Sequence, residues 1–137
     1  MLAIDANIFL ELLLKQERYE ECREFLAEVR DGRVEAIVSE FTVCGIALIL
    51  ERYTKDWRVI RRFFLSLTKY GGLSIYQPTL YDKIEATSLM SAHGLDFEDA
   101  VTLQSALSAK CSAIVSFDKD FNAVGLKRLD PKQAADS

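Results

Sequence analysis

Four acidic residues lie where the sequence pattern changes from an apolar strand to a loop or helix: Asp5, Glu40, Asp99 and Asp118. The carboxyl ends of parallel strands meet at one edge of an open α/β sheet, so acids far apart in the sequence can converge there. Converging carboxylates repel one another unless a positive charge lies among them. Mg²⁺ suits that position because it prefers carboxylate and water oxygens. The pattern therefore predicts metal-assisted chemistry such as phosphodiester hydrolysis.

Each acid also has an ordinary structural explanation. Asp5 and Asp118 are placed to form turns after strands, because Asp side chains bond their own backbone in loops. Turn chemistry explains Asp5 less well, since a helix follows it at once. Glu40 and Asp99 fall in first helical turns, which favour acids, and Asp96 with Asp99 has the spacing of a capping pair. For one acid alone the structural explanation is the stronger, so the case for a site depends on the set.

Five apolar segments have the length and composition of strands: 2–4, 34–38, 73–76, 113–116 and, at an edge, 127–129. Apolar spacing and capping residues predict helices between them: 8–13, 22–29, 40–53, 57–70, 80–93 and 97–110. Ser39, Asp56 and Asp96 are the predicted caps of the third, fourth and sixth helices. Strands that alternate with helices favour parallel pairing. We therefore expect an α/β fold, a three-layer α/β/α sandwich with a central, mostly parallel sheet.

Composition indicates one domain over residues 1–130, because 137 residues that are 50% hydrophobic can bury a single sizeable core. The polar residues 131–137 are expected to form a flexible tail. A net charge of -4 gives no overall attraction to nucleic acid, so any such contact must be local. The three cysteines form no CxxC pair, and neither a signal peptide nor a membrane span is visible. We expect a cytoplasmic protein with no membrane contact.

Four motifs resemble those of the PIN domain family: Asp5-Ala6-Asn7-Ile8, Ser39-Glu40-Phe41, Phe97-Glu98-Asp99-Ala100 and Ser116-Phe117-Asp118-Lys119-Asp120-Phe121. They follow the family's order, and the resemblance extends from residue 1 to about residue 129. It implies a metal-dependent endoribonuclease, most often the toxin of a VapC-type (type II) toxin–antitoxin pair. It also implies that Asp5, Glu40, Asp99 and Asp118 form the catalytic site and hold Mg²⁺ or Mn²⁺. An acid at the position of Asp96 sometimes contributes in that family.

The chain departs from the family pattern at two positions. Ala6 stands where Thr or Ser is common, which removes a hydrogen bond that supports the metal ligands, whereas Ser116 replaces a common Thr and keeps the hydroxyl. Asn7 and Ser116 are expected to lie directly behind the acids, and Asp120 is expected to lie outside the group. All four carboxylates are retained, which indicates a working site.

Water is the expected attacking group. The only histidine, His93, lies beside Gly94 at a predicted helix end and has no visible Cys or Ser partner, so no covalent nucleophile is indicated. Basic residues must then position the RNA. Residues 52–62 interleave basic and aromatic side chains, which is typical of phosphate-contacting surfaces, although a solvated helix face is the more common explanation. The candidate RNA contacts are Arg52, Arg58, Arg61 and Lys119.

The resemblance also implies protein partners, because the family usually dimerises and offers an antitoxin a groove between its early helices. Apolar side chains on these helices exceed what one small sheet would cover, so part of them can form an interface: Leu10, Leu14, Phe41 and Ile46. We therefore expect RNA, a second copy of the chain and a small antitoxin as partners. Two alternatives stay open: a catalytically weak PIN-fold adaptor that binds RNA or protein, and, less well supported, a phosphate-accepting receiver domain.

Overall fold

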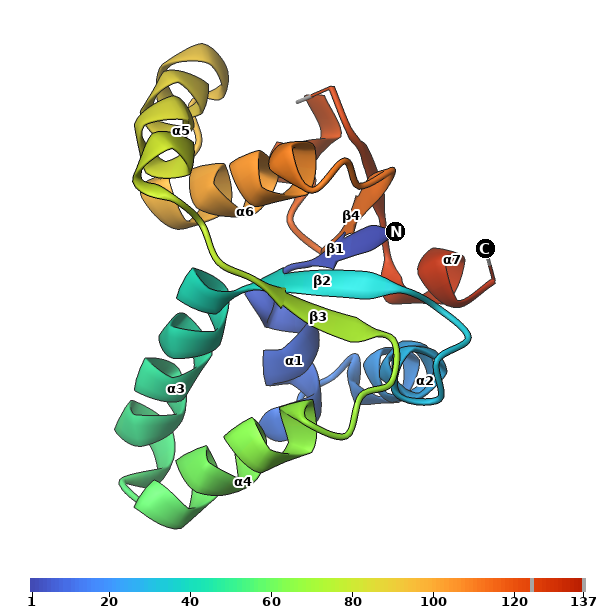
Figure 1. The fold of residues 1–137 in the computed structure, drawn as a ribbon. Helices are drawn as coiled ribbons and strands as arrows, with labels where there is room; N and C mark the ends of the chain where they lie inside the picture. Colours follow the sequence, from blue (N-terminus) through green and yellow to red (C-terminus); the bar gives the residue numbers. More distant parts are fainter. Residues whose placement is uncertain (124, 137) are drawn as a thin grey trace.

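The computed structural model describes residues 1–123 and 125–136 of the chain. It contains a five-stranded parallel sheet of order β3-β2-β1-β4-β5 (Figure 1). The strands are β1 (Leu2–Ile4), β2 (Ala36–Ser39), β3 (Leu73–Tyr76), β4 (Ala113–Val115) and β5 (Lys127–Leu129). The helices are α1 (Ala6–Leu13), α2 (Tyr19–Arg30), α3 (Glu40–Thr54), α4 (Trp57–Leu67), α5 (Leu80–His93), α6 (Phe97–Ser108), α7 (Pro131–Ala135) and the 3₁₀-helix η1 (Lys119–Ala123). The expected α/β sandwich with a parallel sheet is confirmed.

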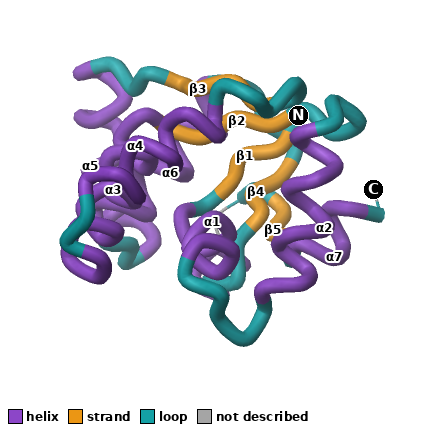
Figure 2. The backbone as a smooth tube through the Cα atoms, turned by 90° about the horizontal axis from the view of Figure 1, so that it is seen from below, coloured by secondary structure: helices purple, strands orange, loops and turns teal. Residues whose placement is uncertain are grey.

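The sheet is covered by helices on both faces, as Figures 1 and 2 show. Leu2 and Ile4 of β1 join a core formed with α1 to α4 and α7, whereas Ala3 points to the core formed with α5 and α6. This alternation follows from the two-residue period of a strand. Ala100 and Ala106 are fully buried on α6, and such small side chains let that helix lie close to the sheet. The sheet edge between the two helical layers is left for polar residues.

The three predicted helix caps are confirmed. The Ser39 hydroxyl accepts a hydrogen bond from the Phe41 amide at 3.2 Å at the start of α3. Asp56 and Asp96 cap α4 and α6 in the same way. Since the free amides of a first turn need such acceptors, a Ser or Asp before an apolar helical pattern marks a helix start reliably.

A buried aspartate joins β3, α5 and α6. Asp82 accepts hydrogen bonds from the Tyr76 hydroxyl at 2.7 Å, the Thr79 amide at 2.9 Å and the Ser108 hydroxyl at 2.7 Å. Burial raises the pKa of Asp82, but these hydrogen bonds outweigh it and lower the pKa to about 2. The ionised carboxylate therefore ties α6, which carries Asp99, to its neighbours.

The C-terminal segment differs from the sequence-based expectation. Residues 131–135 form helix α7 and not a flexible tail, because Asp130 and Gln133 cap the helix reciprocally and Pro131 is buried.

The expected surplus of apolar surface on the early helices is largely packed: Ile46 is fully buried, and Leu10 and Leu14 pack against the core. Other large apolar side chains are exposed on α3 to α5, among them Leu48, Trp57, Leu80, Tyr81 and Ile84. None of the described helices has the length and apolar character that a membrane crossing requires.

The loop after α2 and the loop before β3 meet in a tight corner. The Gly71 and Gly72 amides donate to the carbonyls of Arg30 and Val29, each at 2.9 Å. A Cβ atom on residue 72 would overlap the Val34 carbonyl oxygen and lie 2.8 Å from that of Val29. Glycine is required at residue 72 because backbone atoms occupy the space that a side chain needs.

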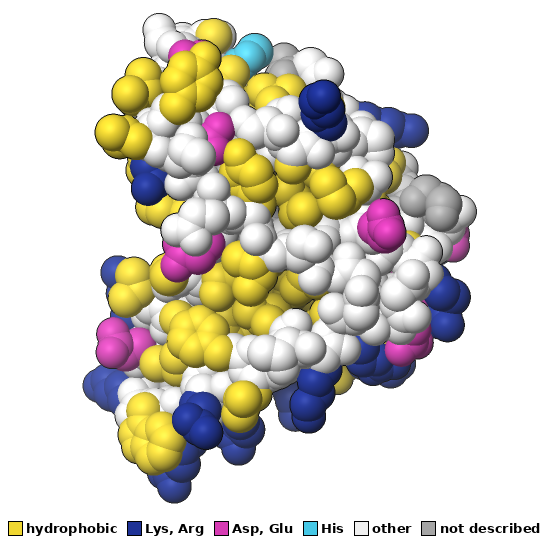
Figure 3. Space-filling model, in the orientation of Figure 1, with side chains coloured by type: hydrophobic (Ala, Val, Ile, Leu, Met, Phe, Trp, Pro, Cys, Tyr) yellow, Lys and Arg dark blue, Asp and Glu magenta, His cyan; other side chains and the backbone are white. Residues whose placement is uncertain are grey.

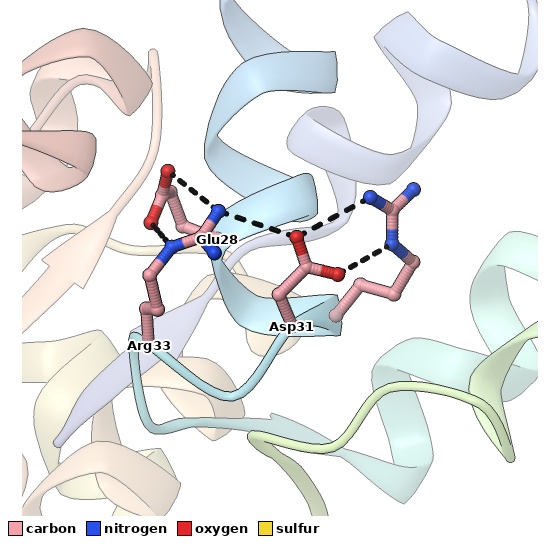
Figure 4. Close-up of polar contacts among 4 residues, drawn as sticks. Glu28, Asp31 and Arg33 are labelled. Atoms are coloured by element: carbon pink, nitrogen blue, oxygen red, sulfur yellow. Dashed lines mark hydrogen bonds and ion pairs between the residues drawn. The ribbon is translucent and has the colours of Figure 1, made fainter.

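Ion pairs also lie at this corner, but they contribute little to its stability. Arg33 contacts Glu28 at 2.6 Å and Asp31 at 3.2 Å, as Figure 4 shows, and Arg30 contacts Asp31 at 3.1 Å. These side chains are solvent-exposed, and exposed pairs typically contribute ~0–1 kcal/mol each. The backbone contacts of the corner are therefore the stronger constraint.

We expect Gly72→Ala to lower the free energy of unfolding by about 1–3 kcal/mol, because the new methyl group overpacks this corner. Gly45→Ala in α3 is the matched control. Its Cβ would meet only the Glu98 carboxylate, at 3.8 Å, and alanine stabilises a helix interior by up to about 1 kcal/mol. Urea unfolding measures both variants, and a Gly72→Ala protein as stable as wild type contradicts the close approach.

Candidate active site

The polar residues that follow β1, β2 and β4 lie at one edge of the sheet. Asp5 follows β1, Ser39 and Glu40 end β2 and begin α3, and Ser116 follows β4. These three strands are adjacent and parallel, so their carboxyl ends share that edge. Helix α6 begins beside them and brings Asp99 in its first turn.

Asp5 has two hydrogen-bond partners and is 5% exposed. Its Oδ1 accepts from the Ala6 amide at 2.8 Å, which makes Asp5 the N-cap of α1. Its Oδ2 accepts from the Ser116 hydroxyl at 2.6 Å. Capping of α1 is therefore one structural role of Asp5. The sequence analysis had judged that turn chemistry explains this residue poorly.

Ser116 joins the separate segments of the site. Its hydroxyl donates to Asp5 and accepts from the Asp118 amide at 2.9 Å and from the Asn7 side-chain nitrogen at 3.4 Å. A hydroxyl has one proton to donate and two lone pairs, so all its capacity is used. The side chain is fully buried, and its hydroxyl fixes Asp5 relative to the loop that carries Asp118.

The orientation of the Asn7 amide follows from this arrangement. Because Ser116 gives its proton to Asp5, Asn7 can approach it only with its NH₂ group. The Asn7 Oδ1 atom is then buried, and it has no hydrogen-bond partner within the described residues. Such an orphaned acceptor typically costs ~1–3 kcal/mol. A bound cation or its water would satisfy it, which is evidence that the site is built for one.

Three carboxyl groups lie close enough to share a cation. Asp99, Asp118 and Asp120 each offer an oxygen within 4.8 Å of the others. The Asp120 amide donates to Asp118 Oδ1 at 2.9 Å, so the short η1 turn folds Asp120 back toward the site. The sequence-based expectation placed Asp120 outside the group, and the structure places it inside. Oxygen donors of this kind fit Mg²⁺ or Mn²⁺.

Burial and mutual repulsion change the acidity of this group. Burial raises the pKa of Asp5 to about 6, against the opposing hydrogen bonds from Ser116 and Ala6, and the charges of Glu98 and Asp118 raise it further. Burial also raises the pKa of Asp99 to about 8, with contributions from Asp5, Asp96 and Asp118. Without a cation, the site therefore keeps a proton near neutral pH.

The other acids take different positions. The described contacts join Glu40 to Cys44, whose Sγ donates to Oε1 at 3.1 Å, and do not place Glu40 in the group within 4.8 Å. Asp96 caps α6 by accepting from the Asp99 amide at 2.8 Å, and its charge raises the pKa of Asp99. Glu98 was missed by the sequence analysis, although its position beside Asp99 in an acidic first turn was a signal. Burial and Asp96 raise the pKa of Glu98.

A groove between α3 and α6 lies beside these acids. Arg52 and Glu98 line it together with Phe41, Cys44, Gly45, Leu48 and Ile49. Figure 3 shows the hollow between the α5–α6 layer and α3, with apolar side chains inside it. Among the other candidate RNA contacts, Arg58 is paired with Asp56 at 3.0 Å, and Arg61 and Lys119 are exposed.

Two further arginines, absent from the sequence-based site, contact the loop after β4. The Arg18 guanidinium lies over the Phe117 ring at 3.9 Å from its centroid. Arg128 on β5 donates from Nη1 to the Ser116 carbonyl at 2.9 Å and from Nε to Asn122 Oδ1 at 2.6 Å. No motif marked either residue, because both reach the loop from elements distant in the sequence.

The family model of the PIN domain matches residues 2–127, and the chain belongs to this family. A search of curated proteins finds no match by sequence. The VapC20 toxin of Mycobacterium tuberculosis, described as cleaving the sarcin-ricin loop, has a TM-score of 0.79 over 96% of this chain and 100% of its own, at 16% identity. A toxin–antitoxin complex from Klebsiella pneumoniae has a TM-score of 0.73 over 96% and 98%, at 16% identity. VapBC2 from Rickettsia felis, bound to a promoter DNA fragment, has a TM-score of 0.72 over 94% and 97%, at 12% identity. At such identities the likeness shows the fold.

Without divalent cations, the free energy of unfolding should fall as the pH rises from about 4 to about 8. The folded pKa values of Asp5 and Asp99 lie above the unfolded value of ~4, so the folded state binds more protons in this range and folding is favoured at its lower end. That advantage disappears as Asp5 and then Asp99 ionise.

Urea unfolding in chelator at several pH values measures this slope. Asp99→Asn should flatten its upper part, whereas Glu24→Gln, which removes an exposed charge from α2, should keep the wild-type slope. A wild-type slope in Asp99→Asn contradicts the proposed crowding of charge.

Proposed function

We propose that this protein is a metal-dependent endoribonuclease that hydrolyses RNA phosphodiester bonds, as the toxin of a type II toxin–antitoxin module. The observation that carries the proposal is the group of carboxylates at the carboxyl edge of the sheet, together with the orphaned Asn7 oxygen beside it. Membership of the PIN family and the likeness to structures described as toxins support it.

The donor set assigns distinct roles within the site. Asp99, Asp118 and Asp120 would hold Mg²⁺ or Mn²⁺, with Asp5 beside them and Asp96 as a further possible ligand. When bound, the cation would lower the pKa of a coordinated water and offset charge on the scissile phosphate. Ser116 keeps Asp5 oriented, and the Asn7 Oδ1 atom can accept a hydrogen bond from water in the site.

Glu40 is proposed to act from the first turn of α3, directly after β2. Its contacts leave it apart from the three closest carboxylates, so its part is to bind or orient water rather than to close the cation group. Asp99 should lose its proton when the cation binds, because the ligand form of a carboxyl is the carboxylate.

RNA contact requires local positive charge, because the acids repel phosphate and the chain is acidic overall. Arg52 lies in the groove beside Glu98, and Lys119 lies between Asp118 and Asp120 in the sequence. These two are proposed as the main phosphate contacts. Arg58 and Arg61 on α4 are proposed as peripheral contacts, and Arg58 is already paired with Asp56.

Protein partners are proposed as well. Exposed apolar side chains on α3 to α5 support a homodimer, and light scattering over a range of concentrations tests it. The cytoplasm is the proposed location. The likeness to structures described as toxin–antitoxin complexes supports a small antitoxin partner. A PIN-fold adaptor with little activity is the alternative, and Mn²⁺ titration separates the two because an adaptor has no need of the cation.

We expect the wild-type protein to cleave structured RNA with Mg²⁺ or Mn²⁺ and not with chelator. Asp5→Asn and Asp118→Asn should reduce cleavage by at least about 100-fold, because each removes a charge that the cation needs. Asp5→Asn should still fold, since the relief of repulsion offsets the loss of one of the two hydrogen bonds that the carboxylate accepts from Ala6 and Ser116.

Asp96→Asn is the matched control. If Asp96 acts as a cap of α6 alone, this variant should fold normally and keep most of its activity. Cleavage by Asp5→Asn at the wild-type rate, or cleavage that continues in chelator, contradicts the proposal.

Arg52→Ala and Lys119→Ala should weaken RNA binding, and each should reduce the salt slope by roughly one unit. Arg58→Ala should have a smaller effect, because its guanidinium is already paired with Asp56. Fluorescence polarisation with labelled RNA in the Asp5→Asn background measures binding without cleavage. Equal losses at all three positions would reject the groove as the local site of contact.

A further inference from the structure

The loop after β4 carries much of the site, and its contacts with the sheet are at its first residue: the Ser116 hydroxyl donates to Asp5, and the Ser116 amide donates to the Leu129 carbonyl at 3.0 Å. Phe121 near its far end is fully buried. The loop contains Ser116, Asp118 and Asp120. The Asp118 amide bonds to the Ser116 hydroxyl, and the Asp120 amide bonds to Asp118 Oδ1. Both are hydrogen bonds between residues two apart. They shape the turn between Ser116 and Asp120.

Arg128 adds side-chain contacts from β5 to this loop. It reaches from β5 to both ends of the loop, donating to the Ser116 carbonyl at 2.9 Å and to the Asn122 side chain at 2.6 Å. A guanidinium suits this position because its donors lie in one plane and their directions are fixed. The distance to Ser116 is typical of an N–H···O hydrogen bond, and that to Asn122 is slightly shorter.

The register of the sheet explains how Arg128 comes to the site. Arg128 pairs with Ile114, and paired residues on neighbouring strands point to the same face. Ile114 and Ala3 point to the core formed with α6. Two residues further along the same strands, Ser116 and Asp5 continue on that side. Arg128 therefore lies on the face where α6 presents its acids.

We propose that Arg128 is a positioning residue that holds the loop of residues 116–122 so that Asp118 and Asp120 can bind the cation. The inference rests on the proposed function for the role of the cation. Once Asp99 loses its proton, like charges push the loop away from it, and the two hydrogen bonds of Arg128 oppose that displacement. The guanidinium also places a positive charge behind the acids without contacting their carboxylates in the described hydrogen bonds.

The test compares Arg128→Met with Lys127→Met. The control removes the same charge from the adjacent, exposed position of β5. Calorimetric titration with Mn²⁺ should show about tenfold weaker binding for Arg128→Met, the range found when groups that support metal ligands are lost, and wild-type binding for Lys127→Met. Arg128→Lys should recover only part of the affinity, because an ammonium group cannot span both acceptors.

A second measurement needs neither cation nor activity. Hydrogen exchange in the metal-free protein should be faster at the Asp118, Asp120 and Phe121 amides in Arg128→Met, and unchanged in Lys127→Met. Asn122→Ala removes one of the two acceptors and should reproduce the faster exchange in part, which keeps the test valid if Arg128→Met fails to fold.

Wild-type loop exchange in both Arg128→Met and Asn122→Ala overturns the inference. The same holds for equal loss of Mn²⁺ affinity in Arg128→Met and Lys127→Met, which would make the effect one of overall charge. A wild-type protein that binds no Mn²⁺ rejects the proposed function instead. The exchange comparison then still decides whether Arg128 holds the loop.

Discussion

Repulsion among carboxylates at one edge of a parallel sheet is the constraint around which this molecule is organised. Parallel strands bring Asp5 and the loop of Asp118 to the same edge, and α6 adds Asp99 in its first turn. Nothing in the sheet itself stabilises such a group of charges. The Ser116 hydroxyl therefore matters, because it holds Asp5 and the Asp118 backbone with a single buried group.

The rest of the fold offsets the unfavourable free energy of bringing these carboxylates together. Raised pKa values at Asp5 and Asp99 mean that ionising these groups opposes folding in the absence of a cation. Two apolar cores, one on each face of the sheet, supply the stability that offsets this. Asp82 adds an anchor that keeps α6 in place. The apolar cores thus stabilise a fold in which the ionised carboxylates at this edge oppose folding until a cation binds.

Much of the fold could be predicted from local patterns, because those patterns act within a few residues. Ser39, Asp56 and Asp96 mark helix starts through hydrogen bonds to the next turn, and the structure confirms all three. Residues 131–135 form a helix where composition predicted a flexible tail, since the reciprocal cap of Asp130 and Gln133 outweighs the polar character of the segment. Ser137 lies outside the described residues. The spacing of Asp130 and Gln133 is that of a capping pair, and it was the sequence signal for a helix in this segment.

The site was harder to predict, because loop geometry and contacts between distant segments decide it. Strand ends indicated the edge where Asp5 and Asp118 lie, but the turn that folds Asp120 back follows from the hydrogen bond of its amide to Asp118, just before η1. Arg128 gave no signal, since its role depends on the register of β5 against β4. Side chains that act through another strand are visible only once the sheet is assembled.

The number of protons released when Mn²⁺ binds tests the central claim most directly. Calorimetric titration in buffers of different ionisation enthalpy measures this number. The account predicts release of about one proton per chain at pH 7, because Asp99, with a pKa of about 8, holds a proton that a metal ligand must lose. Release should fall toward zero near pH 9. Binding of Mn²⁺ at pH 7 without proton release, or no binding at all, would contradict the account.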